Sequence, residues 1–298
     1  MSTTLEGLIA AESARVSGRR KLTDAVFRWS CTGAALLASA ILLVLVVKMV
    51  KEGAPRLSLQ FLTSPPSMRN AQRAGILYPV LGSLWIMVLT VLFTVPVGIG
   101  AAVFLEEFYQ KKTKFRDLIE LNVSNLAGVP SIVYGMLGLG VFVGVFGLGK
   151  NILVGALTMS ILVLPVVIMV TQEALKAVPH VHREASIAMG ATQWETVWRI
   201  VLPIALPGIL TGVILSAARA IGETAPLIVV GAVGLVTFPP RDVNSRYTVL
   251  PLQVLDWIQS PLPAFREIAA GAILVLVTSL FLLNGAAIAI RARSMRKV

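Results

Sequence analysis

Residues 76–105 read ILYPVLGSLWIMVLTVLFTVPVGIGAAVFL, an apolar run that contains no charged side chain. About 20 helical residues cross the hydrocarbon core of a bilayer, so this run predicts a membrane-spanning helix. The composition agrees, because 56% of the 298 residues are hydrophobic and 14% are charged, with a mean hydropathy of +0.83. A soluble domain of this length would need far more polar surface. The sequence therefore predicts an all-α, polytopic membrane protein.

Further apolar runs are also long enough to cross a membrane. Together they predict about six transmembrane helices, at residues 29–50, 76–105, 123–146, 152–175, 206–233 and 268–290. Gly and Pro interrupt several runs, which is tolerated where neighbouring helices cover the freed backbone groups. The outer segment 234–267 contains Trp257 and several apolar residues, so we expect an interfacial or re-entrant cap there. The fold class is thus a membrane helix bundle.

Lys and Arg residues predict the orientation of this bundle. If both termini are cytoplasmic, the two tails and residues 106–122 and 176–205 carry 16 of them, and the outer segments carry nine. Cytoplasmic segments are enriched in Lys and Arg, so this bias predicts that both termini lie inside. The net charge of +11 then reflects loops beside an anionic leaflet. No nucleic-acid partner is expected, because the chain contains no recognisable reading module.

The segment between the fourth and fifth runs differs in character from the rest of the chain. Gly190 is expected to end a first short helix, and Thr192 with Glu195 three residues later fits a capping box that starts a second. Pro203 and Pro207 would end the loop and open the fifth span. Small side chains on the first helix would let another protein approach closely, and a simple tether would need no pair of helices. Along this segment the characteristic residues come in a fixed order. A Glu-Ala-Ser triplet and an alanine come first, then a glycine, and last an Ile-Val-Leu-Pro run: Glu184, Ala185, Ser186, Ala188, Gly190, Ile200, Val201, Leu202 and Pro203.

This order of residues resembles the EAA loop of binding-protein-dependent ABC importer permeases, with Ser186 in place of the usual second alanine. The resemblance implies a MetI-like permease fold, in which the loop forms a coupling helix seated in a cleft of a separate ATPase subunit. ATP and Mg²⁺ would be used by that partner. The resemblance also implies that the chain binds no ATP or other cofactor and has no catalytic residue, and the absence of a Gly-x4-Gly-Lys-Ser/Thr sequence is consistent with this. The implied ATPase-coupling residues are Glu184, Ala185, Ser186, Gly190, Ile200, Leu202 and Pro203.

A pair of opposite charges lies within the fifth run. Arg219 and Glu223 are four residues apart, so on a helix they would share one face and could pair. Arg219 lies roughly 20 Å along this run at 1.5 Å per residue. A lone charge at that depth costs at least about 2.5–3.5 kcal/mol. Two interpretations stay open: a neutralised pair that only locks the bundle, or an anion pathway in which Arg219 binds a tetrahedral oxyanion.

The segment from Arg219 to Thr224, together with the segment from Pro130 to Gly135, resembles the permeases of phosphate-specific ABC importers. Those systems pair two related permeases, PstA and PstC, and residues 225–226 and 250–253 are more similar to PstA. The resemblance covers about residues 70–290. By themselves, residues 130–135 also fit a kinked, tightly packed helix start. The resemblance implies a substrate pathway at Arg219, Glu223 and Thr224 and a structural motif at Pro130, Ser131, Tyr134 and Gly135.

The same resemblance implies partners and a location. The partners are a second, PstC-like permease, homodimeric PstB-like ATPase subunits, and a periplasmic or lipid-anchored phosphate-binding protein. The location is the lipid bilayer of the bacterial cytoplasmic (inner) membrane. The predicted organisation is a cytoplasmic tail (1–28), a first transmembrane helix with a periplasmic segment (29–75), a permease domain (76–290) with the coupling loop (176–205), and a cytoplasmic tail (291–298).

Three other functions would predict different features in the sequence. A permease for sulfate, molybdate or phosphonate would share the loop, and only the phosphate-permease segments argue against it. A secondary transporter should have inverted halves and coupling-ion residues in broken helices. An intramembrane enzyme should have a nucleophile–base set, and His180 with His182 lacks the third ligand of a metal site. Glu106 and Glu107, which end the second run, are interpreted as a solvated helix terminus.

Overall fold

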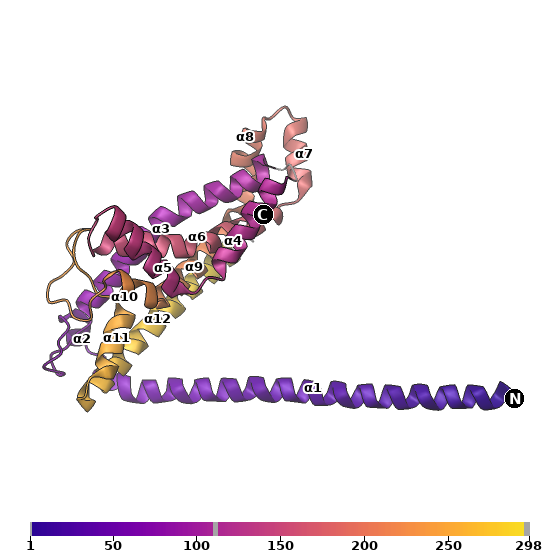
Figure 1. The fold of residues 1–298 in the computed structure, drawn as a ribbon, viewed down its shortest axis with the longest axis horizontal. Helices are drawn as coiled ribbons and strands as arrows, with labels where there is room; N and C mark the ends of the chain where they lie inside the picture. Colours follow the sequence, from indigo (N-terminus) through magenta and orange to yellow (C-terminus); the bar gives the residue numbers. More distant parts are fainter. Residues whose placement is uncertain (1, 110–112, 295–298) are drawn as a thin grey trace. The chain divides into compact units, whose positions relative to one another are not determined.

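The computed structural model describes residues 2–109 and 113–294 (Figure 1). Within these ranges the chain contains helices and no strand, which confirms the all-α fold class. Lys111 and Lys112 of the predicted inner loop lie outside the described residues, as do residues 295–298 of the predicted C-terminal tail.

The chain divides into two compact units, Met1–Lys51 and Glu52–Val298. The first unit consists of helix α1 (Ser2–Gly53), which contains the predicted first span without a break. From Thr23 onward the side chains of α1 are mostly exposed within the chain, and they are apolar enough for a membrane. An apolar helix of this length is suited to a lipid environment.

Four helical runs of the second unit are also long and apolar enough to cross a membrane. They confirm that the predicted second, fourth, fifth and sixth spans are helical, although the fifth has different ends. Each is a continuous run in the structure, and two of them contain a wider, π-helical turn. The runs are α3 (Leu77–Val103) with the π-helical turn Phe104–Phe108, α6 (Ile152–Lys176), α8 (Gln193–Thr196) with the π-helical turn Val197–Val201 and α9 (Leu202–Gly222), and α12 (Pro263–Ser294).

The predicted third span, residues 123–146, is wrong as a single helix. The structure has α4 (Lys114–Ala127) and α5 (Ser131–Gly138), and α5 continues as a π-helical segment, Leu139–Val145. The two halves are bent by 102°. Pro130 causes the break, because it has no N–H and disfavours the helical conformation at the residue before it. The described part of the chain therefore has five candidate spans, or six if this bent pair counts as one.

The ends of the predicted fifth span, residues 206–233, are also wrong. The helix runs unbroken from Gln193 through Pro203 and Pro207 to Gly222. The wider π-helical turn ends two residues before Pro203. Its altered hydrogen bonding leaves room for a residue without a backbone N–H. At the other end the helix stops at Gly222, and the next residue, Glu223, is extended. Pro226 lies in the first turn of the separate helix that follows, α10 (Ala225–Val230), where a missing N–H breaks no helical hydrogen bond.

The segment 234–267 is packed onto the bundle and is not a free linker. It contains α11 (Leu250–Gln259), whose Trp257 is fully buried and donates a hydrogen bond from Nε1 to the Ser67 carbonyl at 3.2 Å. Around Trp257 a hydrophobic cluster joins Phe61 and Phe265. Phe61 belongs to the short helix α2 (Leu59–Thr63), which follows a 3₁₀ turn, Ala54–Arg56.

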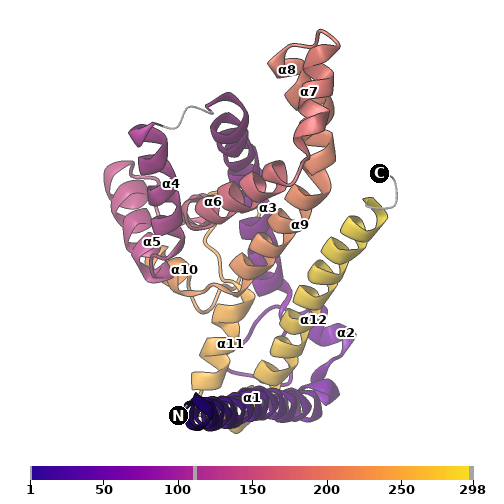
Figure 2. The same cartoon turned by 90° about the vertical axis from the view of Figure 1, so that its right-hand side faces the viewer.

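Helices α3, α6 and α9 form the centre of this unit (Figures 1 and 2). Small residues allow their backbones to approach, as at Gly98, which faces Val167, and at Gly212, which faces Val170. A cluster including Val167, Leu175 and Val201 fills the space between them. α7 (His180–Ala188) and α8 project from one end of these helices, whereas α2 and α11 lie at the opposite end.

Candidate functional site

The segment 180–201 forms a helical hairpin, called here the loop hairpin, that joins α7 to the helix starting at Gln193. Gly190 lies at the bend with φ of +88°, a left-handed conformation that favours glycine. The capping box is present: Thr192 Oγ1 accepts from the Glu195 N–H at 3.3 Å, and Glu195 Oε2 accepts from the Thr192 N–H at 3.0 Å. Both local features of the predicted loop are thereby confirmed.

The residues of the loop hairpin divide into an outer and an inner set. Glu184 and Ala185 are exposed on α7, and so is Ala188. Ser186 is buried, and its hydroxyl lies 2.8 Å from Thr196 Oγ1. The expectation that Ser186 opens the helix to another protein is therefore wrong, because this hydroxyl joins the two arms of the hairpin. Of the remaining coupling candidates, Pro203 is exposed and two others are half-buried, namely Ile200 and Leu202.

Exposed apolar side chains are concentrated on the loop hairpin. Met189 is 88% exposed, and Val181 and Ile187 are also largely exposed. Trp194 and Trp198 lie with their ring centroids 5.3 Å apart and their ring planes tilted by 56°. A patch of this kind on a projecting hairpin is typical of a protein–protein contact.

A cavity of about 410 Å³, called here the Arg219 cavity, lies between α4, α5, α6 and α9. Pro130, Ser131 and Tyr134 line it, and so do Arg219 and Glu223. Two sequence segments almost ninety residues apart thus meet around one space. They are the turn that starts α5 after the bend and the last turn of α9.

Two further residues of the predicted site lie beside the Arg219 cavity rather than in its lining. Gly135 faces α10, where an added β-carbon would lie 2.8 Å from the Pro226 Cα. Thr224 is the N-cap residue of α10 and makes no capping hydrogen bond from its side chain. Residues 130–135 therefore supply both a cavity wall and a tight helix contact.

Arg219 is only loosely paired with Glu223. The helix ends at Gly222 and Glu223 is extended, so Arg219 Nε lies 4.0 Å from Glu223 Oε1. The side chain of Arg219 is 69% exposed and that of Glu223 is 27% exposed. Among the described residues that line the Arg219 cavity, Arg219 has the only positively charged side chain. Most of its forked donors are available to an anion.

A second cavity, of about 520 Å³, follows the groove between α6 and α9. It shares Val166, Ser216 and Arg219 with the Arg219 cavity. Arg219 therefore borders both spaces. The arrangement can hold a small anion at the point where the two cavities meet.

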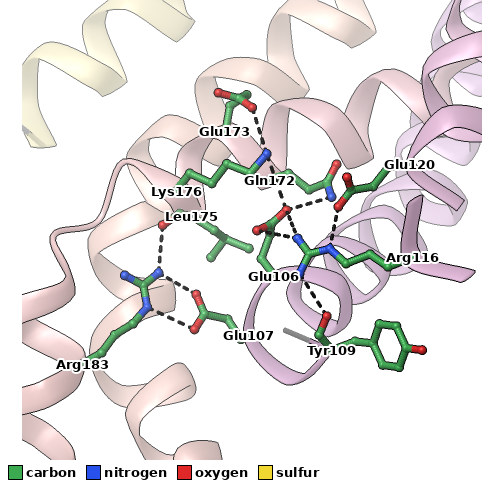
Figure 3. A network of polar contacts seen from close by, with 10 residues as sticks. All are labelled: Glu106, Glu107, Tyr109, Arg116, Glu120, Gln172, Glu173, Leu175, Lys176 and Arg183. Carbon is green, nitrogen blue, oxygen red and sulfur yellow. Dashed lines mark hydrogen bonds and ion pairs between the residues drawn. The ribbon is translucent and has the colours of Figure 1, made fainter. Parts of the chain in front are cut away.

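Glu106 and Glu107 are not a solvated helix terminus, and that interpretation is wrong. Figure 3 shows both carboxylates in the π-helical turn Phe104–Phe108, surrounded by basic and amide side chains. Glu107 is 3% exposed and accepts two hydrogen bonds from Arg183, at 2.6 and 3.1 Å. Glu106 accepts from Gln172 at 3.0 Å and forms an ion pair with Arg116 at 3.4 Å. A carboxylate pair directly after an apolar run was the available signal, but its partners lie far away in the sequence.

Residues 94–293 match the family model described as "Binding-protein-dependent transport system inner membrane component". The match covers more than half of the chain. The chain belongs to this family.

Curated relatives extend over most of this permease. It is 34% identical over 280 residues to the "Probable ABC transporter permease protein YqgI" of Bacillus subtilis, covering 90% of the chain and 95% of the relative. It is 33% identical over 254 residues to the "Phosphate transport system permease protein PstC" of Mesorhizobium japonicum, covering 75% and 77%. It is 35% identical over 224 residues to the "Phosphate transport system permease protein PstA 1" of Mycobacterium tuberculosis H37Rv, covering 75% and 71%.

Solved structures confirm the fold of the permease. An inward-facing MetNI methionine ABC transporter gives a TM-score of 0.60 at 19% identity, covering 72% of this chain and 94% of that one. A bacterial ABC transporter that imports alginate gives 0.53 at 14% identity, covering 89% and 98%. The protein is thus a multi-pass inner-membrane permease of an ABC importer with a MetI-like fold.

Proposed function

We propose that this permease carries inorganic phosphate across the membrane. The observation that carries the proposal is the Arg219 cavity, whose lining includes a loosely paired guanidinium together with Pro130, Ser131 and Tyr134. Phosphate at neutral pH carries between one and two negative charges, so its passage through a low-dielectric bundle needs compensating positive charge. The names of the PstA and PstC relatives support phosphate as the anion.

Glu223 limits how strongly an anion is held. Its carboxylate lies close enough to Arg219 to reduce the local positive potential, but too far for a fully formed ion pair. A very tight anion site would trap the substrate. A partly neutralised arginine is therefore suited to transport.

ATP and Mg²⁺ belong to partners in this proposal, and the chain itself binds no cofactor. Homodimeric, PstB-like ATPase subunits dock on the exposed face of the loop hairpin, where Glu184 and Ala185 lie. A second, PstC-like permease completes the pathway. A periplasmic or lipid-anchored phosphate-binding protein delivers the substrate.

The test is uptake by vesicles that contain the permease copurified with its ATPase and the second permease, with the phosphate-binding protein supplied on the periplasmic side. We expect ATP-dependent uptake of labelled phosphate that excess sulfate, molybdate or phosphonate does not suppress. Suppression by one of these anions with little phosphate uptake would identify another oxyanion as substrate. Uptake that persists without ATP or the ATPase would identify a secondary transporter.

Gly190 provides a prediction about ATPase coupling. Replacing Gly190 with valine should impair docking without preventing membrane insertion, because φ of +88° strains a branched side chain. No heavy atom lies within 4 Å of the added β-carbon position, so the effect inside this chain is conformational rather than steric. Gly190→Asn is the matched control, since asparagine tolerates this conformation better. Docking is measured as crosslinking of Ala185→Cys or Ala188→Cys to the ATPase in an active complex. If neither position crosslinks, the docking assignment is wrong.

Topology provides a second prediction. The distribution of Lys and Arg predicts that the two terminal segments, residues 1–28 and 291–298, are both cytoplasmic. Reporter fusions at Glu6 and Val298 should therefore behave as cytoplasmic fusions. The orientation would be contradicted by a signal, at either position, from a reporter that is active only outside the cytoplasm.

A further inference from the structure

The π-helical turn Phe104–Phe108 joins two sets of contacts through adjacent residues (Figure 3). Glu107 contacts the loop hairpin, and Glu106 contacts α4 and α6. Both sets include charged hydrogen bonds, which are stronger than neutral ones. The turn therefore lies between the proposed ATPase contact and the helix that leads to the Arg219 cavity.

Glu107 holds both arms of the loop hairpin. Its carboxylate accepts from Arg183 Nε at 3.1 Å and Nη2 at 2.6 Å, and Arg183 is on α7. Its backbone carbonyl accepts a hydrogen bond from Gln193 Nε2, at the start of the other arm. Arg183 also donates to the carbonyls of Leu175 and Val178, at 2.9 and 2.7 Å. The hairpin is thus fixed to the end of α3 as one body.

The Glu107–Arg183 pair is withdrawn from solvent, with side-chain exposures of 4% and 14%. Salt screens such a pair much less than it screens exposed charges. Removing one partner would leave an uncompensated buried charge. The geometry of this pair is therefore strongly restricted.

Glu106 holds the start of α4. Arg116, in the first turn of α4, donates to Glu106 at 3.4 Å and to Glu120 at 2.7 Å. Its Nη1 also donates to the Tyr109 carbonyl at 3.0 Å, which fixes the guanidinium against the end of the π-helical turn. Lys176, at the end of α6, lies 3.6 Å from Glu106.

The far end of α4 forms a wall of the Arg219 cavity. Leu126 and Ala127 line it, followed by Gly128. The Tyr134 hydroxyl donates to the Leu126 carbonyl at 2.7 Å and thereby joins α4 to α5. A helix of 14 residues extends about 21 Å at 1.5 Å per residue. One rigid rod thus connects the carboxylate turn with the cavity.

We propose that Glu106 and Glu107 are positioning residues that transmit the position of the loop hairpin to the cavity wall. The proposal rests on the proposed docking of an ATPase on that hairpin. Two successive residues on one helical turn cannot move independently, so a shift of α7 through Glu107 displaces the partner of Arg116 as well. Contiguous ion pairs and rigid helices are the physical means by which two sites are coupled.

The test uses the full complex in vesicles, with Cys31→Ser as background and Ala127→Cys as a reporter in the cavity wall. The measured quantity is the change in maleimide labelling rate of the reporter when ADP and vanadate trap the ATPase. We expect a change of at least about fivefold in the parent, the lower end of typical coupling between sites. Glu106→Gln should reduce the change to less than about twofold while the Ala185→Cys crosslink to the ATPase persists. Glu107→Gln should abolish the response as well.

Glu173→Gln is the matched control. Glu173 belongs to the same group and pairs with Lys176 at 3.3 Å, but its side chain is 75% exposed. Its replacement should leave the response of the reporter at the parental level. A parental response in Glu106→Gln or Glu107→Gln would overturn the proposal.

Two measurements separate failure of the relay from failure of the proposed function. Glu106 contacts α4 and α6 rather than the loop hairpin. Glu106→Gln therefore still tests the proposal if the Glu107→Gln complex does not assemble. If both Ala185→Cys and Ala188→Cys fail to crosslink to the ATPase in the active parent, ATPase docking is rejected, and the relay with it. A parental crosslink together with an unchanged response in Glu106→Gln would reject the relay alone.

Discussion

Replacing Arg219 with glutamine is expected to lower phosphate uptake per assembled complex by at least about tenfold. Hydrogen bonds to a charged group contribute about 1.5–3 kcal/mol each, and 1.4 kcal/mol corresponds to a factor of ten. Arg219 has the only positively charged side chain among the described residues that line its cavity, so no neighbour there replaces its charge. Assembly should be preserved, because the Arg219 side chain is 69% exposed. The measurement is initial uptake divided by the amount of complex recovered.

Glu223 provides the control for this prediction. Glu223→Gln leaves the positive charge in place, so its effect should be milder. If the two residues only formed a locking pair, each single change would lower the amount of folded complex. The double replacement would then restore transport. Normal uptake in Arg219→Gln/Glu223→Gln would therefore reject a pathway role for Arg219.

Replacing Gly135 with alanine is expected to destabilise the permease by about 1–3 kcal/mol, the usual range for overpacking. The added β-carbon would lie 2.8 Å from the Pro226 Cα and 2.9 Å from its carbonyl oxygen. Both are backbone atoms, so α5 and α10 must separate to make room. The measurement is the thermal unfolding midpoint of the detergent-solubilised protein. A decrease of several degrees is expected.

Gly140→Ala is the matched control for Gly135→Ala. Gly140 lies in the continuation of the same helix, and an added β-carbon there meets no heavy atom within 4 Å. Alanine also favours helix over glycine, so this variant should be no less stable than the parent. Equal unfolding midpoints for the two variants would contradict the close contact between α5 and α10.

The apolar runs and the turn chemistry of the loop were accessible from the sequence because they depend on nearby residues. A run such as residues 76–105 specifies its own burial in lipid, whatever its neighbours are. The capping box of Thr192 and Glu195 closes within four residues, and Gly190 supplies the bend by its own conformational freedom. These local features, with the spacing of the Glu184–Pro203 segment, were sufficient to indicate the family.

The ends of the helices were predicted less well, because proline has opposite effects in different surroundings. Pro130 and Pro226 lie where a new helix begins after a break, whereas Pro203 and Pro207 lie inside a continuous one. A wider turn, Val197–Val201, relieves the missing donor before Pro203, whereas Pro207 lies within the regular α-helix, so the outcome depends on the surrounding backbone and its packing. Hydropathy contains no such information, so residues 123–146 appeared to be one span.

By itself, the sequence determined that the chain is a helical membrane protein with an EAA-type loop, since hydrophobicity and capping act over a few residues. Only the tertiary structure decided which distant residues the two carboxylates after the second apolar run contact. Glu107 and Arg183 are 76 residues apart, and Glu106 and Gln172 are 66 apart. A charge selects its partner by distance in space and by burial, neither of which is encoded in local spacing. For the same reason, only the fold could bring Arg219 to Pro130 and Ser131 around one cavity.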